Sequence, residues 1–446
     1  MKLSAFRSEI TPPLGHPLCA GWYPPAQGIS HPLFANGVVL FPENQSPIVL
    51  CALDWAELSN GEHDLWRNQL AQAAGTTPDR VAIHCIHAHD TPWPDREAQT
   101  LLDETGNPPI IMQRAWCDEV LQAMGGVVRS AIHKAVVITE IRVGHAPVRT
   151  VASNRRILGP DGKIHGVRWT SCPDAALRAE PEGLIDPNLK TISFWGEGRK
   201  LAGLHYYAVH PTSYDGTGWV TPDFVGIARE RLSEAEGVPH VYFTECAGNI
   251  TCGKYNDGMA DNREWFARQI LDAMVLSEQN ARAYPPSEVR WITDAVILPP
   301  REDLTREAMQ KVMRDPEAAQ GAKSRAALAL AYRNRCEAGI PITISALRIG
   351  DGIAILHLPG EAFIEYQLFA QSLCPGVTLA VPAYGDCGPG YIPLTRSFEE
   401  GGYEPADAFC SPESQGILEE SIRRILAAPA SGRSLPIRNP GRIFPG

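Results

Sequence analysis

Two histidines, His87 and His89, stand one residue apart at the end of an apolar run, residues 81–86. In an extended chain, residues two apart project to the same side, so we predict that the two imidazoles share a face. Such a pair can bind a metal together, or one can bind it while the other moves protons. A pair of hydrogen-bonded histidines at a strand end fits this motif equally well. The residues further along the chain therefore decide its function.

Three stretches of the sequence share one order of elements, which positions the polar residues at strand ends. Each stretch predicts a hairpin, then a helix, then another strand. The predicted elements are residues 34–42, 47–55, 60–74 and 81–89; residues 191–195, 201–210, 224–235 and 240–246; and residues 342–349, 353–361, 363–373 and 377–384. We predict an α/β fold of mixed β-sheets flanked by helices, built from these three hairpin–helix–strand pseudo-repeats. We expect a single domain, 1–446, with a peripheral helical segment at 301–336.

Polar residues follow these strands, and strand ends in open α/β sheets are where ligands bind. We therefore expect the following residues to converge: Asp54, His87, His89, His210, Glu245, Asn249, Glu361, Asp386 and Tyr391. Random polar residues after strands would give part of this pattern, because strands often stop at polar positions.

The composition limits the classes of partner. The 446 residues carry a formal net charge of −11, which disfavours nucleic acid and anionic membranes as partners. No apolar run approaches the roughly 20 residues of a membrane-spanning helix, and early charges such as Lys2 and Arg7 do not fit a signal peptide. The 11 cysteines show no framework spacing, which suits a reducing compartment. We expect a cytoplasmic protein with a small-molecule substrate, and a homo-oligomer stays possible.

Several motifs together resemble one family. They are His87-Ala-His-Asp-Thr-Pro92, Asn154-Arg155, Ala208-Val-His-Pro-Thr-Ser213, Asp223, Pro359-Gly-Glu361, and the run from Tyr391 through Thr395 to Tyr403-Glu404. In this order, and across nearly the whole chain, they resemble the catalytic domain of the neutral, non-lysosomal ceramidases. Each motif alone is weak, but the set is fairly specific.

The resemblance implies a role for each matching residue. It assigns zinc ligands to His87, His210, Glu361 and Tyr391, a donor set that suits zinc and does not exclude manganese or iron. It assigns the catalytic histidine to His89, an arginine near the substrate to Arg155, and the tyrosine facing the developing oxyanion to Tyr403. Each residue also has a plain structural interpretation, such as a core tyrosine or a helix-capping carboxylate.

The sequence departs from the family pattern at several positions. Asn249 and Thr251 replace an acid and a serine of the family, and Asp90 follows the histidine motif. With Asp54, these residues are our candidates for substrate binding. We find no counterpart of the family's C-terminal β-sandwich domain or secretion signal, and so expect a divergent member.

The sequence therefore predicts a zinc-dependent hydrolase, most simply one that cleaves a C–N amide bond in a relatively polar small molecule. Two alternatives remain. One is a glycoside-cleaving enzyme, for which Asp54, Asp90, Glu245 and Glu361 offer carboxylates. The other is a catalytically degenerate metal-containing binding protein, which the amide of Asn249 suggests because an amide cannot act as a general base.

Overall fold

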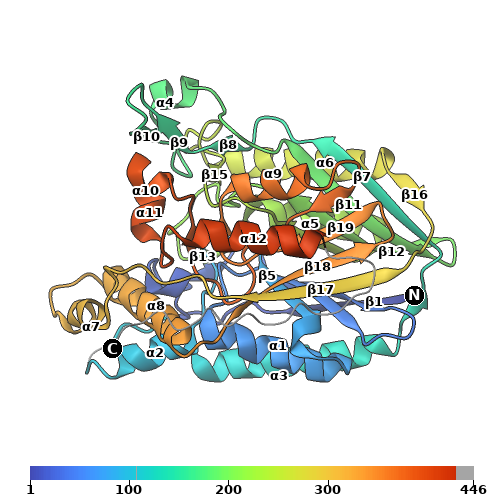
Figure 1. The fold of residues 1–446 in the computed structure, drawn as a ribbon, viewed down its shortest axis with the longest axis horizontal. Helices are drawn as coiled ribbons and strands as arrows, with labels where there is room; N and C mark the ends of the chain where they lie inside the picture. Colours follow the sequence, from blue (N-terminus) through green and yellow to red (C-terminus); the bar gives the residue numbers. More distant parts are fainter. Residues whose placement is uncertain (107, 428–446) are drawn as a thin grey trace.

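The computed structural model describes residues 1–106 and 108–427 (Figure 1). The predicted fold class is confirmed, because three larger mixed β-sheets are flanked by helices. The predicted single domain, 1–446, includes residues 428–446, which lie outside the described part.

The first sheet carries the strand that leads to His87. Its strand order is β5-β4-β3-β1-β6. Strand β4 is buried along its whole length, because α1 and α3 pack on one side of the sheet and the second sheet lies on the other. The bounds are β1 Lys2–Glu9, β3 Phe34–Phe41, β4 Ile48–Leu53, β5 Val81–Cys85, β6 Val136–Val137, α1 Asn60–Ala74 and α3 Arg114–Ile132.

The second sheet carries the strand that leads to His210. Its order is β14-β12-β11-β7-β16, with α5 packed on β14 and α6 on β7 and β11. Strand β14 also contacts β3, β4 and β5, which joins the first two sheets. The bounds are β7 Glu140–Pro147, β11 Asn188–Gly196, β12 Arg199–Tyr207, β14 His240–Thr244, β16 Arg282–Tyr284, α5 Asp223–Glu236 and α6 Asn262–Gln279.

The third sheet leads to Glu361. Its order is β17-β18-β19-β21, and α12 lies across β17 and β18 and contacts α9 (Figure 1). The bounds are β17 Val289–Val296, β18 Ile342–Ile349, β19 Ile353–His357, β21 Thr378–Ala380, α9 Ile364–Ser372 and α12 Ser414–Ala427.

Each large sheet contains an antiparallel hairpin followed by a helix and a strand parallel to the second hairpin strand. The hairpins are β3–β4, β11–β12 and β18–β19, and the parallel partners are β5, β14 and β21. Because β4 and β5, and likewise β12 and β14, run in the same direction, their carboxyl ends reach the same edge of the sheet. The residues after these strands are therefore brought together.

Residues 301–336, predicted as a peripheral helical segment, form α7 and most of α8. Helix α8 is buried over residues 326–332.

The remaining described elements are η1 Cys19–Gly21, η2 Pro78–Arg80, β2 Gly28–Ile29, β8 Ser153–Asn154, β9 Arg156–Leu158, β10 Ile164–Val167, β13 Trp219–Val220, β15 Ile250–Thr251, β20 Glu361–Ala362, β22 Tyr391–Ile392, α2 Arg96–Asp103, α4 Ala175–Ala179, α7 Arg306–Arg314, α8 Gln320–Glu337, α10 Ser397–Glu400 and α11 Tyr403–Asp407. Within residues 1–106 and 108–427, no helix is long and apolar enough to cross a membrane.

Candidate metal centre and active site

Three predicted metal ligands meet at one point in the interior. His87 follows β5, His210 follows β12 and Glu361 follows β19, so each comes from a different large sheet. Nε2 of His87 lies 3.3 Å from Oε2 of Glu361, and Nε2 of His210 lies 3.2 Å from the same oxygen. All three side chains are buried. The convergence predicted for the strand ends is present for these residues.

Backbone carbonyls fix which imidazole nitrogen faces Glu361. Nδ1 of His87 donates to the Ala56 carbonyl at 2.8 Å, and Nδ1 of His210 donates to the Ala247 carbonyl at 2.7 Å. Each Nε2 atom therefore faces a carboxylate oxygen, and it can bind a metal ion there when it carries no proton. Among the described residues, Nε2 of His210 and Oε2 of Glu361 have no hydrogen-bond partner. Three buried acceptors around one point fit a cation, and two nitrogens with one oxygen fit zinc.

The electrostatics at this point also favour a positive charge. Burial opposes protonation of His87, but the carboxylates of Glu361 and Glu57 outweigh it and raise its pKa to about 10. Burial and the nearby Arg155 lower the pKa of His210 to about 3, so this imidazole stays neutral. A proton or a metal ion can supply the positive charge between the two carboxylates.

The shared strand face predicted for His87 and His89 is wrong. Strand β5 ends at Cys85, and His87 has a left-handed backbone with φ +69°. This conformation costs a non-glycine residue roughly 1–3 kcal/mol and is typical of functional sites. The turn still keeps the two rings together, with centroids 5.0 Å apart. Tyr384 also has a left-handed backbone, with φ +58°, and the centroid of its ring lies 4.4 Å from that of His87.

His89 belongs to a different hydrogen-bond network from His87. Its Nδ1 lies 3.0 Å from Oδ2 of Asp215, and the Tyr23 hydroxyl donates to the same oxygen at 2.5 Å. Burial alone would raise the pKa of Asp215, but the hydrogen bonds from His89 and Tyr23 lower it, so Asp215 is ionised. Because Asp215 accepts from Nδ1 of His89, Nε2 is the ring nitrogen that remains open to another partner.

The two predicted tyrosines lie beside the metal centre. Strand β22 pairs with β20 in parallel, which sets Tyr391 against Glu361. The Tyr391 ring is nearly parallel to that of His210, with centroids 6.5 Å apart, and its hydroxyl lies 3.1 Å from that of Tyr403. Tyr403 in turn packs against the exposed indole of Trp169, at 4.5 Å between centroids.

Arg155 holds the two tyrosines in place. Its guanidinium donates to the Tyr391 hydroxyl at 3.0 Å and to Glu404 at 3.1 Å, and it also donates to the Gly248 carbonyl. It lies 4.7 Å from the centroid of the Tyr403 ring. The side chain is buried, and its Nε and Nη2 donors are occupied, whereas Nη1 has no hydrogen-bond partner among the described residues.

The four predicted substrate-binding residues are held by internal bonds, and we do not keep them in the site. Asp54 is fully buried in an ion pair with Arg229. Asp90 accepts hydrogen bonds from the backbone and side chain of Thr217. Their polar atoms are already satisfied, which explains the difference from the expectation.

Asn249 and Thr251, the other two predicted substrate-binding residues, also have their polar atoms occupied by hydrogen bonds within the protein. Oδ1 of Asn249 accepts from the backbone N–H of Ile364 at 2.9 Å, and its amide donates to Glu365 at 2.9 Å. Asn249 thus caps the start of α9. The Thr251 hydroxyl donates to the Arg168 carbonyl at 3.1 Å.

Sequence reasoning missed four side chains around the site: Glu57, Tyr384, Asp215 and Tyr23. Glu57 is fully buried, and its Oε2 lies 3.4 Å from Nδ1 of His87. A signal existed for two of them, because Glu57 lies three residues after Asp54 and Asp215 lies five residues after His210. Tyr23 comes from a loop far from every strand-end motif, so no local pattern points to it.

The comparisons with known proteins bear on the fold. No family model matches the sequence, and no curated protein matches it. The structure is similar to that of neutral ceramidase from Pseudomonas aeruginosa, with a TM-score of 0.69, 15% identity, and coverage of 98% of this chain and 76% of that chain. A structure described as ceramidase complexed with C2 matches with a TM-score of 0.69, 14% identity, and coverage of 98% and 77%.

The chain has the fold of neutral ceramidase. The resemblance drawn from the motifs is therefore confirmed for the fold, over almost all of this chain. At 15% identity, the activity of this ceramidase-like chain has to be argued from its own residues.

Proposed function

We propose that this ceramidase-like chain is a zinc-dependent hydrolase that cleaves a C–N amide bond in a small, relatively polar substrate. The observation that carries the proposal is the meeting of His87, His210 and Glu361, whose acceptor atoms face one point. A zinc ion bound there would bring the pKa of a water ligand to about 7 and polarise the scissile carbonyl. Tyr391 is proposed as the fourth ligand.

The proton-transfer group in this proposal is His89. Asp215 accepts its Nδ1–H, which leaves Nε2 to take a proton from the attacking water and return it to the leaving amine. Tyr23 stabilises the Asp215 carboxylate through its hydroxyl. In the relay formed by these three residues, the ionised member, Asp215, is half-buried beside the imidazole.

Tyr403 is proposed as the hydrogen-bond donor to the oxygen on which charge develops. Burial raises its pKa above the ordinary value for tyrosine, so its hydroxyl keeps the proton that it must donate. Arg155 lies against the ring and holds the neighbouring Tyr391 hydroxyl, which fixes the geometry of the pair.

The glycosidase alternative has less support. Of its four candidate carboxylates, Asp54 pairs with Arg229, Asp90 is hydrogen-bonded to Thr217, and Glu245 pairs with Lys190 at 2.8 Å. A glycosidase of the usual kind needs two available carboxyl groups flanking one bond.

A screen of acyl amides before and after chelation tests the proposal. We expect hydrolysis of at least one N-acyl amide, loss of the rate after removal of metal, and recovery on addition of zinc. Stoichiometric zinc with no turnover on any amide would favour a degenerate binding protein, and unchanged turnover without metal would contradict the proposed chemistry.

A further inference from the structure

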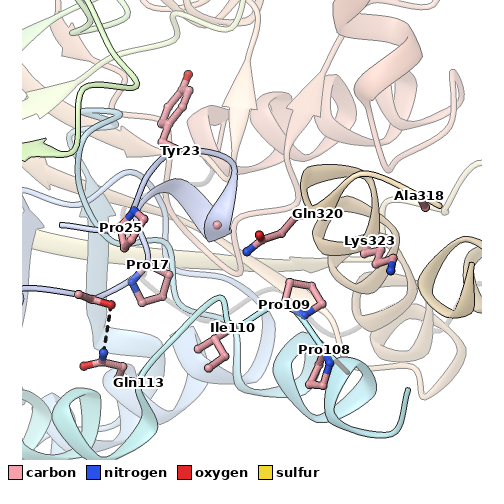
Figure 2. Close-up of a pocket in the computed structure, with 12 residues that line it drawn as sticks. Pro17, Tyr23, Pro25, Pro108, Pro109, Ile110, Gln113, Ala318, Gln320 and Lys323 are labelled. Atoms are coloured by element: carbon pink, nitrogen blue, oxygen red, sulfur yellow. Dashed lines mark hydrogen bonds between the residues drawn. The ribbon is translucent and has the colours of Figure 1, made fainter. Parts of the chain in front are cut away.

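A second feature of the molecule lies next to the proposed active site and has no part in the chemistry above. It is a cavity of about 550 Å³ between three segments: the loop from Gly15 to Pro25, residues 108–113, and the start of α8. The lining residues are Gly15, Pro17, Gly21, Tyr23, Pro25, Pro108, Pro109, Ile110, Gln113, Ala318, Gln320 and Lys323 (Figure 2). Its volume is in the range of small-molecule sites.

Tyr23 connects this cavity to the proposed proton relay. Tyr23 is one of the lining residues, and its side chain extends away from the others in Figure 2; its hydroxyl lies 2.5 Å from Asp215 and 3.3 Å from Nδ1 of His89. The same loop is tied to the histidine motif, because the backbone N–H of Cys19 donates to the Thr91 carbonyl at 2.8 Å. Tyr23 therefore belongs both to the cavity lining and to the hydrogen-bond network of His89.

The lining changes in chemistry from one end to the other. Prolines and Ile110 form apolar walls, and Gln113, which donates to the Gly15 carbonyl at 3.3 Å, is the polar residue below them in Figure 2. Tyr23 and Lys323 lie at opposite ends of the lining (Figure 2). Gln320 projects between them toward the loop that carries Pro17 and Pro25.

The described part of the cavity lining contains one charged residue, Lys323, at the end opposite to Tyr23. Among the described lining residues, Lys323 alone carries a charge, and it forms no ion pair with a described residue. The chain as a whole has a net charge of −11, so a carboxylate-free cavity with one half-buried lysine is a local exception. An ammonium that has no ion-pair partner among the described residues, beside apolar cavity walls, favours a ligand with an apolar body and an anionic end.

We propose that this cavity binds the part of the substrate remote from the scissile amide, and that this part ends in a carboxylate held by Lys323. The inference rests on the proposed amide hydrolysis and makes the substrate class narrower: an N-acyl compound whose acyl chain carries a terminal carboxylate. The catalytic end lies past Tyr23, and the carboxylate lies against Lys323.

Two matched substrates test the inference. One is the mono-p-nitroanilide of suberic acid, and the other is octanoyl p-nitroanilide, which differs by having a methyl group in place of the carboxylate. We expect a higher kcat/KM for the suberyl compound. Lys323→Met should lower the ratio of the two kcat/KM values about tenfold or more, because it keeps the side-chain length and removes the charge.

Lys311→Met is the matched control, because Lys311 is an exposed lysine of α7 outside the cavity lining, and this variant should leave the ratio unchanged. Equal kcat/KM values for the two anilides in the parent protein, or a ratio that Lys323→Met does not alter, would overturn the inference while amide hydrolysis itself stands.

Calorimetric binding of suberate separates the two proposals if neither anilide is cleaved. Suberate that binds the parent and the Lys311→Met variant but not the Lys323→Met variant would support the anionic cavity, even though the amide chemistry would then be contradicted. Absence of binding in the parent protein, together with absence of cleavage, would overturn the cavity assignment.

Discussion

His87 and His89 differ in which group accepts from their Nδ1 atoms, and the different roles that we propose for them rest on this difference. A backbone carbonyl accepts from Nδ1 of His87, so Nε2 is the ring nitrogen that faces Glu361 and would bind a metal. A carboxylate, Asp215, accepts from Nδ1 of His89, which orients the ring and leaves Nε2 open to another partner. Spacing in the sequence pointed to both residues, whereas their hydrogen-bond partners come from the folded chain. The ligand atoms of His87, His89 and His210 lie within 4.8 Å of one another, so the variants below are needed to distinguish a ligand from a base.

The two alanine variants should therefore behave differently. His87→Ala should lose the metal, because one of few ligands is removed. His89→Ala should keep the metal and lose turnover by roughly a hundredfold or more, the range for a positioned acid–base group. Metal content by mass spectrometry and kcat on a cleaved amide check both. Metal loss in His89→Ala with retention in His87→Ala would reverse the assignment.

The roles proposed for Tyr403 and Tyr391 can be distinguished in the same way, by removing one hydroxyl at a time. Tyr403→Phe should keep the metal and lower kcat by about 10²–10³, as when one oxyanion donor is removed. Tyr391→Phe should weaken metal binding without abolishing it, because the ligands His87, His210 and Glu361 remain. Parental kcat in Tyr403→Phe, or parental metal affinity in Tyr391→Phe, would contradict the respective role.

At the level of elements, the strand and helix pattern was largely predictable. The predicted helix at 60–74 matches α1, and the predicted hairpin strands at 342–349 and 353–361 match β18 and β19 with small differences at the ends. These elements have strong apolar periodicity, which local sequence carries. The predicted strand through His89 stops at Cys85, because the chain turns at His87 with a positive φ that no spacing rule signals.

The site itself was predictable only in part. His87, His210 and Glu361, the proposed metal ligands, follow predicted strands, which is why the sequence points to them. Whether a polar residue is free or satisfied depends on distant partners: Asp54 is paired with Arg229, 175 positions away, and Asn249 bonds Ile364, 115 positions away. Tyr23 was missed for the same reason, since its contacts to His89 and Asp215 come from tertiary folding.

We predict that Asn249 contributes to the stability of the fold and does not bind substrate. Asn249→Ala removes the acceptor for the first N–H of α9 and a hydrogen bond to Glu365, so we expect the free energy of unfolding to fall by about 1–2 kcal/mol. Metal content should stay at the parental value. Urea denaturation and metal analysis check this. A stable variant with lost substrate affinity would instead restore Asn249 to the substrate-binding residues.

At the level of the whole molecule, one buried ionic network joins the second sheet to helix α9, which follows the third sheet's hairpin. Lys190 of β11 lies 2.8 Å from both Asp186 and Glu245, and Gln367 of α9 donates to Asp186 at 2.8 Å. Burial opposes ionisation of Asp186, but Lys190 outweighs it and lowers its pKa to about 2. Burial raises the pKa of Glu245, which acts in the opposite direction.

The lowered pKa of Asp186 determines how its contribution to the free energy of unfolding changes with pH. Its folded pKa lies below the ordinary value of about 3.9, so the ionised carboxylate stabilises the fold above that pH and its contribution disappears as the pH falls from about 4 to about 2. Asp186→Asn should reduce the free energy of unfolding by about 2 kcal/mol at pH 7, and the difference from the parent should shrink over that acid range. Urea titrations across pH, with the surface variant Asp161→Asn as control, check this; a difference that does not change with pH would contradict it.

The central claim is that His87, His210 and Glu361 hold one metal ion, and metal content measured on purified protein tests it most directly. The account predicts about one equivalent of zinc in the parent protein and in His133→Ala, a control at an exposed histidine, and none in folded His210→Ala. Circular dichroism confirms that the variants are folded. Full zinc content in His210→Ala would contradict the account.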